Sequence, residues 1–248
     1  MFNIFKKKPV APQTPILLPF QTDIHSHILA GIDDGSPDIE TSLQLVKGIY
    51  DLGIRKTVAT PHVIADMYRN TPEIINGALE KLKAATKEAG IDIEISAAAE
   101  YMLDDYFIKM LKDEEPLLCI HKNIVLTEQS YAAGSNNLNE IAFEIMKKGY
   151  RPIMAHPERY YYYHDNFEQY GHLKDMGFLL QVNILSLAGY YGKQTAKAAR
   201  YIFDNDLADL VGTDMHHTRH LSIMQDRKSQ ELFHKYLHKK TYNVLSEL

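Results

Sequence analysis

Hydrophobic and polar positions along the chain follow two alternating patterns. Short apolar runs rich in β-branched residues, typical of buried parallel strands, are followed by longer segments with apolar residues at helical spacing. The expected strands span residues 22–26, 55–60, 92–98, 124–127, 152–155, 178–182 and 209–212. Strand–helix alternation repeated about seven times predicts a parallel sheet with crossover helices, and seven units favour a closed or nearly closed barrel.

Two of the expected helices carry clear start signals. Ser36-Pro37-Asp38 offers an N-cap hydroxyl, a first-turn proline and an acid before apolar residues at helical spacing. Thr71-Pro72-Glu73 repeats this pattern before the next apolar stripe. Further helices are expected over residues 103–112, 137–148, 166–176, 193–204 and 226–237.

Composition narrows the class of protein. A net charge of −5 argues against a dedicated nucleic-acid binder. Cys119 is the only cysteine, which excludes a disulfide within the chain and a cysteine metal cluster. Residues 1–20 contain three lysines followed by four prolines, and we interpret them as a flexible leader before a single domain over 21–248. No apolar stretch reaches the length of a membrane span, so we expect a cytoplasmic protein without membrane insertion.

Candidate chemistry begins at the end of the first expected strand. His25 and His27, two residues apart on a strand, point to the same side and form half of a metal site. Two nearby glycines allow a sharp turn, which brings Asp33 or Asp34 back towards the same histidines.

Six of the seven expected strands end in a histidine or an acidic residue. Because the carboxyl ends of parallel strands meet at one edge of a barrel, these side chains should lie together. They are His25, His27, His62, Glu100, Glu128, His156, Asp214 and His216. Nitrogen and carboxylate ligands without thiolates predict a multinuclear site for Mn, Fe or Zn.

The order of these residues resembles the PHP (polymerase and histidinol phosphatase) superfamily. Within it, the segments DIHSHILAGIDDGS, ATPH, MAHPERY and GTDMHH are similar to the bacterial PHP-type protein-tyrosine phosphatases encoded with capsule and exopolysaccharide genes. The resemblance covers roughly residues 21–225. It implies a distorted (β/α)7 TIM-like barrel with three divalent metal ions, Mn²⁺ being the first candidate. It also implies that the substrate is a phosphotyrosine protein, namely a tyrosine kinase that controls polysaccharide synthesis and export.

The resemblance assigns the ligands as well. The first ion would be held by His25, His27, Glu100 and Asp214. Glu100 would bridge to a second ion, which Glu128 and His156 also hold. The third ion would be held by Asp34, His62 and His216, with the adjacent Asp33 as the alternative to Asp34.

Charge balance suggests the reaction. Three divalent ions and four carboxylates leave about two net positive charges, which attract a phosphate dianion and lower the pKa of bound water to ~7. We expect a metal-bound hydroxide to attack phosphorus in line, while Arg159 holds two phosphate oxygens. Arg219 is a second candidate for phosphate binding. Asp214 is a candidate proton donor to the leaving phenolate, but a metal-bound acid donates poorly, and the general acid stays open.

Tyrosines are the candidates for contact with the rest of the substrate. Tyr160, which opens the run 160–163, either builds an aromatic wall for a phosphotyrosine ring or covers the barrel rim. Tyr68 is a second rim candidate. A thiolate mechanism is excluded because Val125, and not an arginine, stands six residues after Cys119.

Two other functions are compatible with the same motifs. The site could hydrolyse a small substrate, such as histidinol phosphate, or a phosphodiester. Alternatively, the protein could be a non-catalytic regulator with a degenerate barrel, although no expected ligand position is lost.

Overall fold

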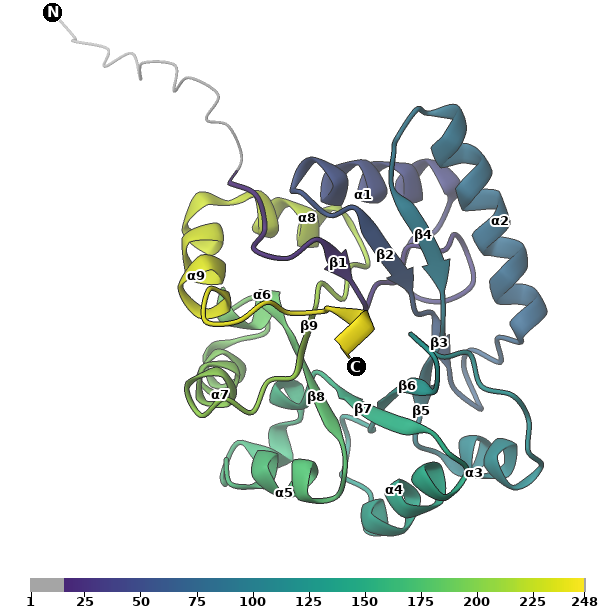
Figure 1. Ribbon diagram of the computed structural model, residues 1–248, viewed down its shortest axis with the longest axis vertical. Helices are drawn as coiled ribbons and strands as arrows, with labels where there is room; N and C mark the ends of the chain where they lie inside the picture. Colours follow the sequence, from purple (N-terminus) through teal and green to yellow (C-terminus); the bar gives the residue numbers. More distant parts are fainter. Residues whose placement is uncertain (1–15, 248) are drawn as a thin grey trace, which may run out of the picture.

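The computed structural model describes residues 16–247, in which parallel strands lie at the centre and helices surround them (Figure 1). One sheet has the order β1-β2-β4 and the other the order β3-β5-β6-β7-β8-β9. The strands are β1 (Thr22–Asp23), β2 (Lys56–Ala59), β3 (His62–Val63), β4 (Glu94–Ala97), β5 (Glu100–Met102), β6 (Ile124–Glu128), β7 (Arg151–Ala155), β8 (Leu179–Asn183) and β9 (Leu210–Gly212). Every pairing between them is parallel, so the expected class of α/β fold is confirmed.

The two sheets are continuous through two interrupted strands. β2 leads into β3, and β4 leads into β5, across breaks of two residues each. Backbone hydrogen bonds from Ala98 to Ala59 (2.8 Å) and from Glu100 to Pro61 (3.1 Å) span these breaks. The sequence pattern predicted the first half of each strand but not β3 or β5, which are too short to show a period. Their register places His62 directly beside Glu100.

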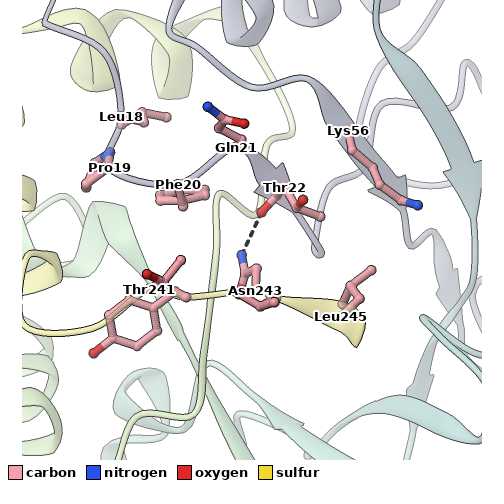
Figure 2. A pocket seen from close by; sticks show the side chains of 11 residues that line it. Leu18, Pro19, Phe20, Gln21, Thr22, Lys56, Thr241, Asn243 and Leu245 are labelled. Carbon is pink, nitrogen blue, oxygen red and sulfur yellow. Dashed lines mark hydrogen bonds between the residues drawn. The ribbon is translucent and has the colours of Figure 1, made fainter. Parts of the chain in front are cut away.

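The first and last strands meet without forming a regular ladder, and we call this junction the β1–β9 seam. The Asp23 carboxylate accepts hydrogen bonds from the Thr213 backbone nitrogen (3.0 Å) and hydroxyl (2.6 Å). At the amino ends of the strands, the Asn243 amide donates to the Thr22 and Val211 carbonyls at 2.7 and 2.9 Å, as Figure 2 shows for Thr22. Beyond the strand ends, the backbone nitrogens of His27 and Asp214 donate to the carbonyls of Met215 and His25, both at 2.8 Å. These backbone bonds and the side chains of the seam together hold the two edges in place.

The start of the first helix differs from the expectation. Asp38, rather than Ser36, is the N-cap of α1 (Ile39–Asp51), because its side chain accepts a hydrogen bond from the backbone nitrogen of Thr41. Thr71 caps α2 (Pro72–Glu88) with proline in the first turn, as predicted.

The other expected helices are present as α3 (Asp105–Lys112), α4 (Leu138–Lys147), α5 (Gln169–Asp175), α7 (Lys193–Asp204) and α9 (Arg227–Leu237). The sequence pattern missed α6 (Ile184–Leu187), α8 (Thr218–Gln225) and three short 3₁₀ helices, η1 (Pro157–Arg159), η2 (Tyr161–Tyr163) and η3 (Leu245–Glu247). Among the described residues, no helix combines the length and the apolarity that crossing a bilayer requires.

Apolar side chains pack in two layers. A large cluster includes side chains of most helices and strands, and a smaller one consists mainly of strand residues, with Leu245 packed against it. The large cluster includes Leu18 and Phe20, and the Leu18 backbone donates to the Leu52 carbonyl at 2.7 Å. The expectation of a loose leader is therefore wrong for residues 16–20, while residues 1–15 lie outside the described part of the chain.

Candidate metal and phosphate site

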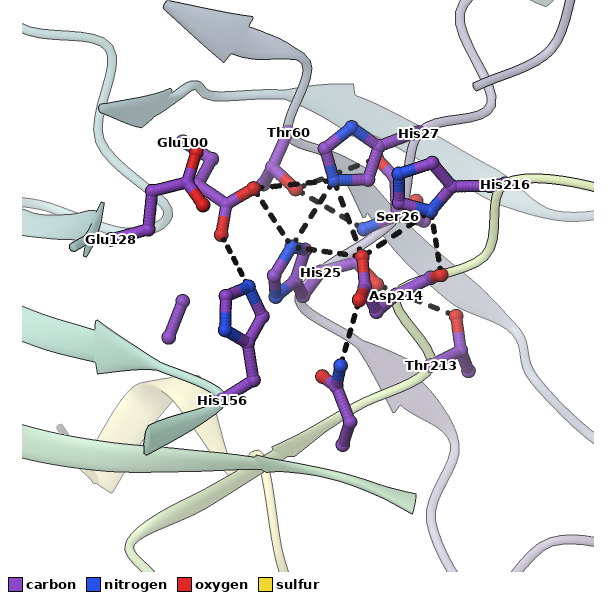
Figure 3. Close-up of polar contacts among 12 residues, drawn as sticks. His25, Ser26, His27, Thr60, Glu100, Glu128, His156, Thr213, Asp214 and His216 are labelled. Carbon is purple, nitrogen blue, oxygen red and sulfur yellow. Dashed lines mark hydrogen bonds and ion pairs between the residues drawn. The ribbon is translucent and has the colours of Figure 1, made fainter. Parts of the chain in front are cut away.

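The expected ligands converge at the carboxyl ends of the strands, as Figure 3 shows for those other than Asp34 and His62. His25 and His27 follow β1, His156 follows β7, and Asp214 follows β9, while Glu128 is the last residue of β6. All nine expected ligands fall into compact groups of potential metal-binding atoms, namely His27–Asp34–His62–His216, His25–His27–Glu100, His25–His156–Asp214 and His62–Glu100–Glu128.

Glu100 lies at the centre of this cluster. Its Oε2 is 3.3 Å from the Nε2 of both His25 and His27, and 3.2 Å from the Nδ1 of His62. Its other oxygen, Oε1, faces the Nε2 of His156 at 3.0 Å. The two oxygens thus face different histidines, which is the arrangement that a bridging carboxylate requires.

Neighbouring side chains fix which nitrogen of each histidine faces the cluster. The Nδ1 of His25 lies 2.7 Å from the Gln181 amide oxygen, and the Nδ1 of His27 lies 2.8 Å from Asp33. The Nδ1 of His216 lies 2.9 Å from the backbone carbonyl of Asp214. Because each of these partners accepts a hydrogen bond from Nδ1–H, the lone pair of Nε2 is left for a metal ion.

The two adjacent aspartates have different roles. The Asp33 side chain is fully buried, and it accepts hydrogen bonds from the backbone nitrogens of Gly35 (3.0 Å) and His62 (3.2 Å) as well as facing His27. The Asp34 side chain is 53% exposed and lies 3.4 Å from His62 Nε2. Asp34 is therefore the ligand candidate of the two, and Asp33 orients the ring of His27.

Two glycines shape the loop that carries these aspartates. Gly31 has a φ of +71°, which favours glycine. A Cβ at Gly35 would lie 2.0 Å from the carbonyl oxygen of His27, so only glycine lets the loop return to the strand end.

Two ligand candidates also have unusual backbone conformations. His156 and Asp214 have φ values of +33° and +50°, in the left-handed region. Such conformations cost about 1–3 kcal/mol each and persist where the surroundings hold them, often at functional sites. At both positions, the strained backbone turns the side chain in at the end of its strand.

The donor set fits divalent metal ions. Both oxygens of Glu100, Oε1 of Glu128 and Nδ1 of His62 are buried and have no hydrogen bond from the described residues. Burial and the facing Glu100 raise the pKa of Glu128. Burial opposes ionisation of Glu100 too, but His25 and His62 outweigh it and hold its pKa well below the ordinary value. Buried carboxylates that face each other in this way are stabilised by a cation between them.

None of the groups coincides with an expected ligand set. His27 joins the Asp34–His62–His216 group, and Asp214 lies outside the His25–His27–Glu100 group. Glu128 Oε1 lies 2.8 Å from His62 Nδ1, whereas His156 groups with His25 and Asp214. Glu128 and His156 both belong to the cluster but do not share a group.

Arg159 lies at the edge of the cluster beside Asp214. Its Nη1 donates to Asp214 Oδ2 at 2.6 Å, and its guanidinium carbon lies 4.9 Å from the Tyr131 ring and 4.2 Å from the Tyr191 ring. Burial and the charges of His216, His25 and Arg159 act in opposite directions on Asp214, and the charges prevail, so that its pKa is well below the ordinary value. Asp214 is thus held as a carboxylate, which argues against a role as proton donor.

The expectation of substrate contact is wrong for Tyr160. This side chain is fully buried, and its hydroxyl donates to the Ala155 carbonyl and accepts from the Gln129 backbone nitrogen. Tyr161, the next residue of the same run, is 64% exposed. The other two candidates remain accessible: Tyr68 stacks on His62 with ring centroids 5.9 Å apart, and Arg219 is exposed on α8.

The structure adds residues that the sequence did not single out. Gln181 lies within β8, and its amide links His25 to Asn183, which in turn donates to Asp214 Oδ2 at 2.7 Å. Tyr131 and Tyr191 lie in loops that are distant from Arg159 in the sequence, and the tertiary structure brings them into contact with it. A polar residue inside a buried strand is the one sequence signal that could have identified Gln181.

Fold and site together define a parallel α/β protein whose strand ends carry a His/Asp/Glu cluster able to hold metal ions. The chain belongs to the family described as capsular polysaccharide synthesis, CpsB/CapC, whose model matches residues 21–246. This match confirms the family resemblance drawn from the motifs.

Named relatives agree with the family. The tyrosine-protein phosphatase CpsB of Streptococcus pneumoniae is 32% identical over 200 residues, which cover 78% of this chain and 82% of the relative. The tyrosine-protein phosphatase YwqE of Bacillus subtilis is 27% identical over 197 residues, covering 79% and 78% of the two chains.

Solved structures agree as well. A crystal structure from the study of YwqE and CpsB, described as unique metal-dependent tyrosine phosphatases, matches with a TM-score of 0.78 and 25% identity over 91% of this chain and 90% of that one. The phosphotriesterase homology protein of Escherichia coli matches with a TM-score of 0.50 and 14% identity over 86% and 87% of the two chains, which indicates a shared fold alone.

Proposed function

We propose that this protein is a metal-dependent protein-tyrosine phosphatase that acts in the cytoplasm on a tyrosine kinase of capsular or exopolysaccharide synthesis. The observation that carries the proposal is that the carboxylate of Asp214 contacts both Arg159 and His25, which belongs to the His/Asp/Glu cluster. The activity printed for the CpsB and YwqE relatives supports the reaction, and the family description supports the setting in capsule synthesis.

We propose that the strands form a distorted (β/α)7 barrel and that the nine clustered residues hold three divalent ions. Two oxygens facing different histidines support Glu100 as the bridge. The donors contain no thiolate, so Mn²⁺, Fe and Zn²⁺ all suit the site, and Mn²⁺ is the first to test. When bound, the ions supply positive charge for the phosphate and acidify water.

The chain's own residues bind and orient the substrate. Arg159 is held on Asp214 and between two tyrosine rings, so its guanidinium is fixed before the phosphate arrives. Such a fixed donor stabilises the charge that builds on the phosphate oxygens in the transition state. Asp214 stays deprotonated and positions Arg159. Tyr68 and Arg219 are our candidates for contact with the polypeptide around the phosphotyrosine.

The test is phosphate release from a phosphotyrosine peptide after chelation, with and without added Mn²⁺. A phosphoserine peptide and histidinol phosphate are assayed in parallel. We expect release that requires metal and prefers phosphotyrosine. Faster turnover of histidinol phosphate would replace the substrate assignment, and metal-loaded protein that binds its kinase without releasing phosphate would favour a regulatory role.

A further inference from the structure

A small pocket of about 250 Å³ lies over Arg159, next to the cluster. It is lined by Tyr131, Arg159, Tyr161, Tyr191 and Thr195. These residues come from separate segments, since Tyr131 follows β6, Tyr161 opens η2, and Tyr191 precedes α7. Three tyrosines from three segments therefore line one pocket together with Arg159.

The arginine is oriented for a ligand in this pocket. Its side chain is 21% exposed, and the rings of Tyr131 and Tyr191 lie within 4.9 Å of the guanidinium carbon. Aromatic contacts of this kind hold a guanidinium in place without using its N–H groups. When a phosphate ester binds Arg159, its organic group would thus lie in this pocket, next to the tyrosine rings.

Tyr191 offers a further polar contact. Its hydroxyl is buried and has no hydrogen-bond partner among residues 16–247. A buried hydroxyl without a hydrogen-bond partner costs stability, and a ligand that accepts a hydrogen bond from it removes this cost. Phosphate oxygens on Arg159 are acceptors of the required kind.

The size of the pocket limits what it can receive. Pockets for whole small-molecule ligands span about 300–1,000 Å³, whereas this one is smaller. It suits a single ring rather than a nucleotide or a sugar chain. Tyr161, 64% exposed, gives the mouth of the pocket an aromatic surface that an aliphatic ester would leave uncovered.

We infer that this pocket is the subsite for the aromatic ring of the substrate, with Tyr161 and Tyr191 as residues that determine preference for aryl over alkyl phosphate esters. The inference rests on the proposed phosphatase function. The ring packs against the tyrosine faces, while Arg159 and the Tyr191 hydroxyl bind the phosphate.

Calorimetric binding of phenylphosphonate and methylphosphonate to the full chain loaded with Mn²⁺ tests the inference without requiring turnover. We expect the wild-type protein to prefer phenylphosphonate. Tyr161→Ala should lower this preference about three- to tenfold, the range measured for aromatic pairs, and leave methylphosphonate binding unchanged. Tyr191→Ala should weaken both ligands, phenylphosphonate more strongly, whereas Tyr191→Phe should weaken both equally.

Tyr50→Ala is the matched control. The guanidinium carbon of Arg55 lies 4.2 Å from the Tyr50 ring, which is the distance between Arg159 and the Tyr191 ring, but Tyr50 is not part of the pocket. This substitution should leave the preference unchanged. An unchanged preference in both alanine variants of the pocket would overturn the inference. If the protein releases phosphate from the phosphotyrosine peptide but does not prefer phenylphosphonate, the subsite is contradicted and the proposed function stands. If it prefers phenylphosphonate but releases no phosphate, the proposed function is contradicted and the subsite stands.

Discussion

Arg159 and Asp214 form a contact of 2.6 Å between Nη1 and Oδ2, while the other oxygen of Asp214 lies 3.4 Å from the Nε2 of both His25 and His27. One carboxylate therefore contacts the His/Asp/Glu cluster on one side and, on the other, the side chain that we propose to bind phosphate. A change at Arg159 and a change at His27 should consequently have separable effects.

Arg159→Ala should lower kcat/KM for a phosphotyrosine peptide by about 100- to 1,000-fold, the usual loss when a fixed donor to transition-state charge is removed. Metal content should stay the same, because Asn183 still donates to Asp214 Oδ2 at 2.7 Å. Steady-state kinetics and elemental analysis of the same preparation give both values. Arg159→Lys should restore little, since an ammonium cannot form the paired contact. Loss of metal in proportion to activity would show that Arg159 acts through the cluster.

His27→Ala should lose metal before any loss of folded structure. His27 belongs to two of the four candidate groups, so its removal weakens both. Metal per chain is measured by elemental analysis after dialysis, with circular dichroism to monitor the fold. His172→Ala is the control, because His172 is an exposed histidine on α5 whose Nδ1 lies 3.7 Å from Asp175. Full metal occupancy in His27→Ala would contradict the ligand assignment.

Gln181→Leu should weaken metal binding by about 10- to 100-fold, as is typical when the partner of a ligand histidine is lost. The substitution keeps a similar volume but removes the oxygen that accepts from His25 Nδ1. Competition with a chelator of known affinity measures the change. If Gln181→Glu, which keeps an acceptor, binds metal as weakly as Gln181→Leu, the hydrogen bond is not what matters.

Removal of metal should lower the melting temperature. An ion present at 100 times its dissociation constant adds about 2.7 kcal/mol of stability per site, which corresponds to about 5–10 °C for each ion in a domain of this size. The buried Glu100 and Glu128 lose their shared counter-charge when the ions leave. Thermal melts before and after chelation measure this shift, and His27→Ala should show a smaller one. Identical shifts in both proteins would place the stabilising ion elsewhere.

Alkylation of Cys119 should be slow at neutral pH and should not inhibit phosphate release. Burial raises the pKa of its thiol to about 11, so the reactive thiolate is scarce at pH 7. The alkylation rate should rise about tenfold per pH unit until the pH approaches this pKa. Mass spectrometry follows the modification, and Cys119→Ser should keep full activity. Rapid alkylation at pH 7 with parallel inactivation would reopen a thiolate mechanism.

Much of this architecture could be predicted from the sequence because it depends on periodic patterns. Strand–helix alternation determines which polar residues end a strand, and parallel strands bring those ends together. Helix α7 was expected with the bounds that the structure shows. The short strands β3 and β5 escaped prediction because two or three residues have no measurable period.

The environment of the site could not be predicted in this way. The direction of each side chain in the run 160–163 depends on tertiary packing, so Tyr160 and Tyr161 could not be told apart. Tyr131 and Tyr191 reach Arg159 from loops whose path no local pattern determines. Gln181 can be noticed in the sequence as a polar residue within an expected strand, but its contact with His25 depends on the pairing of β8 on both sides.

The β1–β9 seam has a consequence for how the molecule is made. Asp23 and Thr213, which face each other across it, are 190 positions apart in the chain. During synthesis, His25 and His27 emerge early but lack Asp214 and His216 until the last strand has left the ribosome. If these residues hold the ions as proposed, the nascent chain offers a metal ion only part of the ligand set until the first and last strands meet.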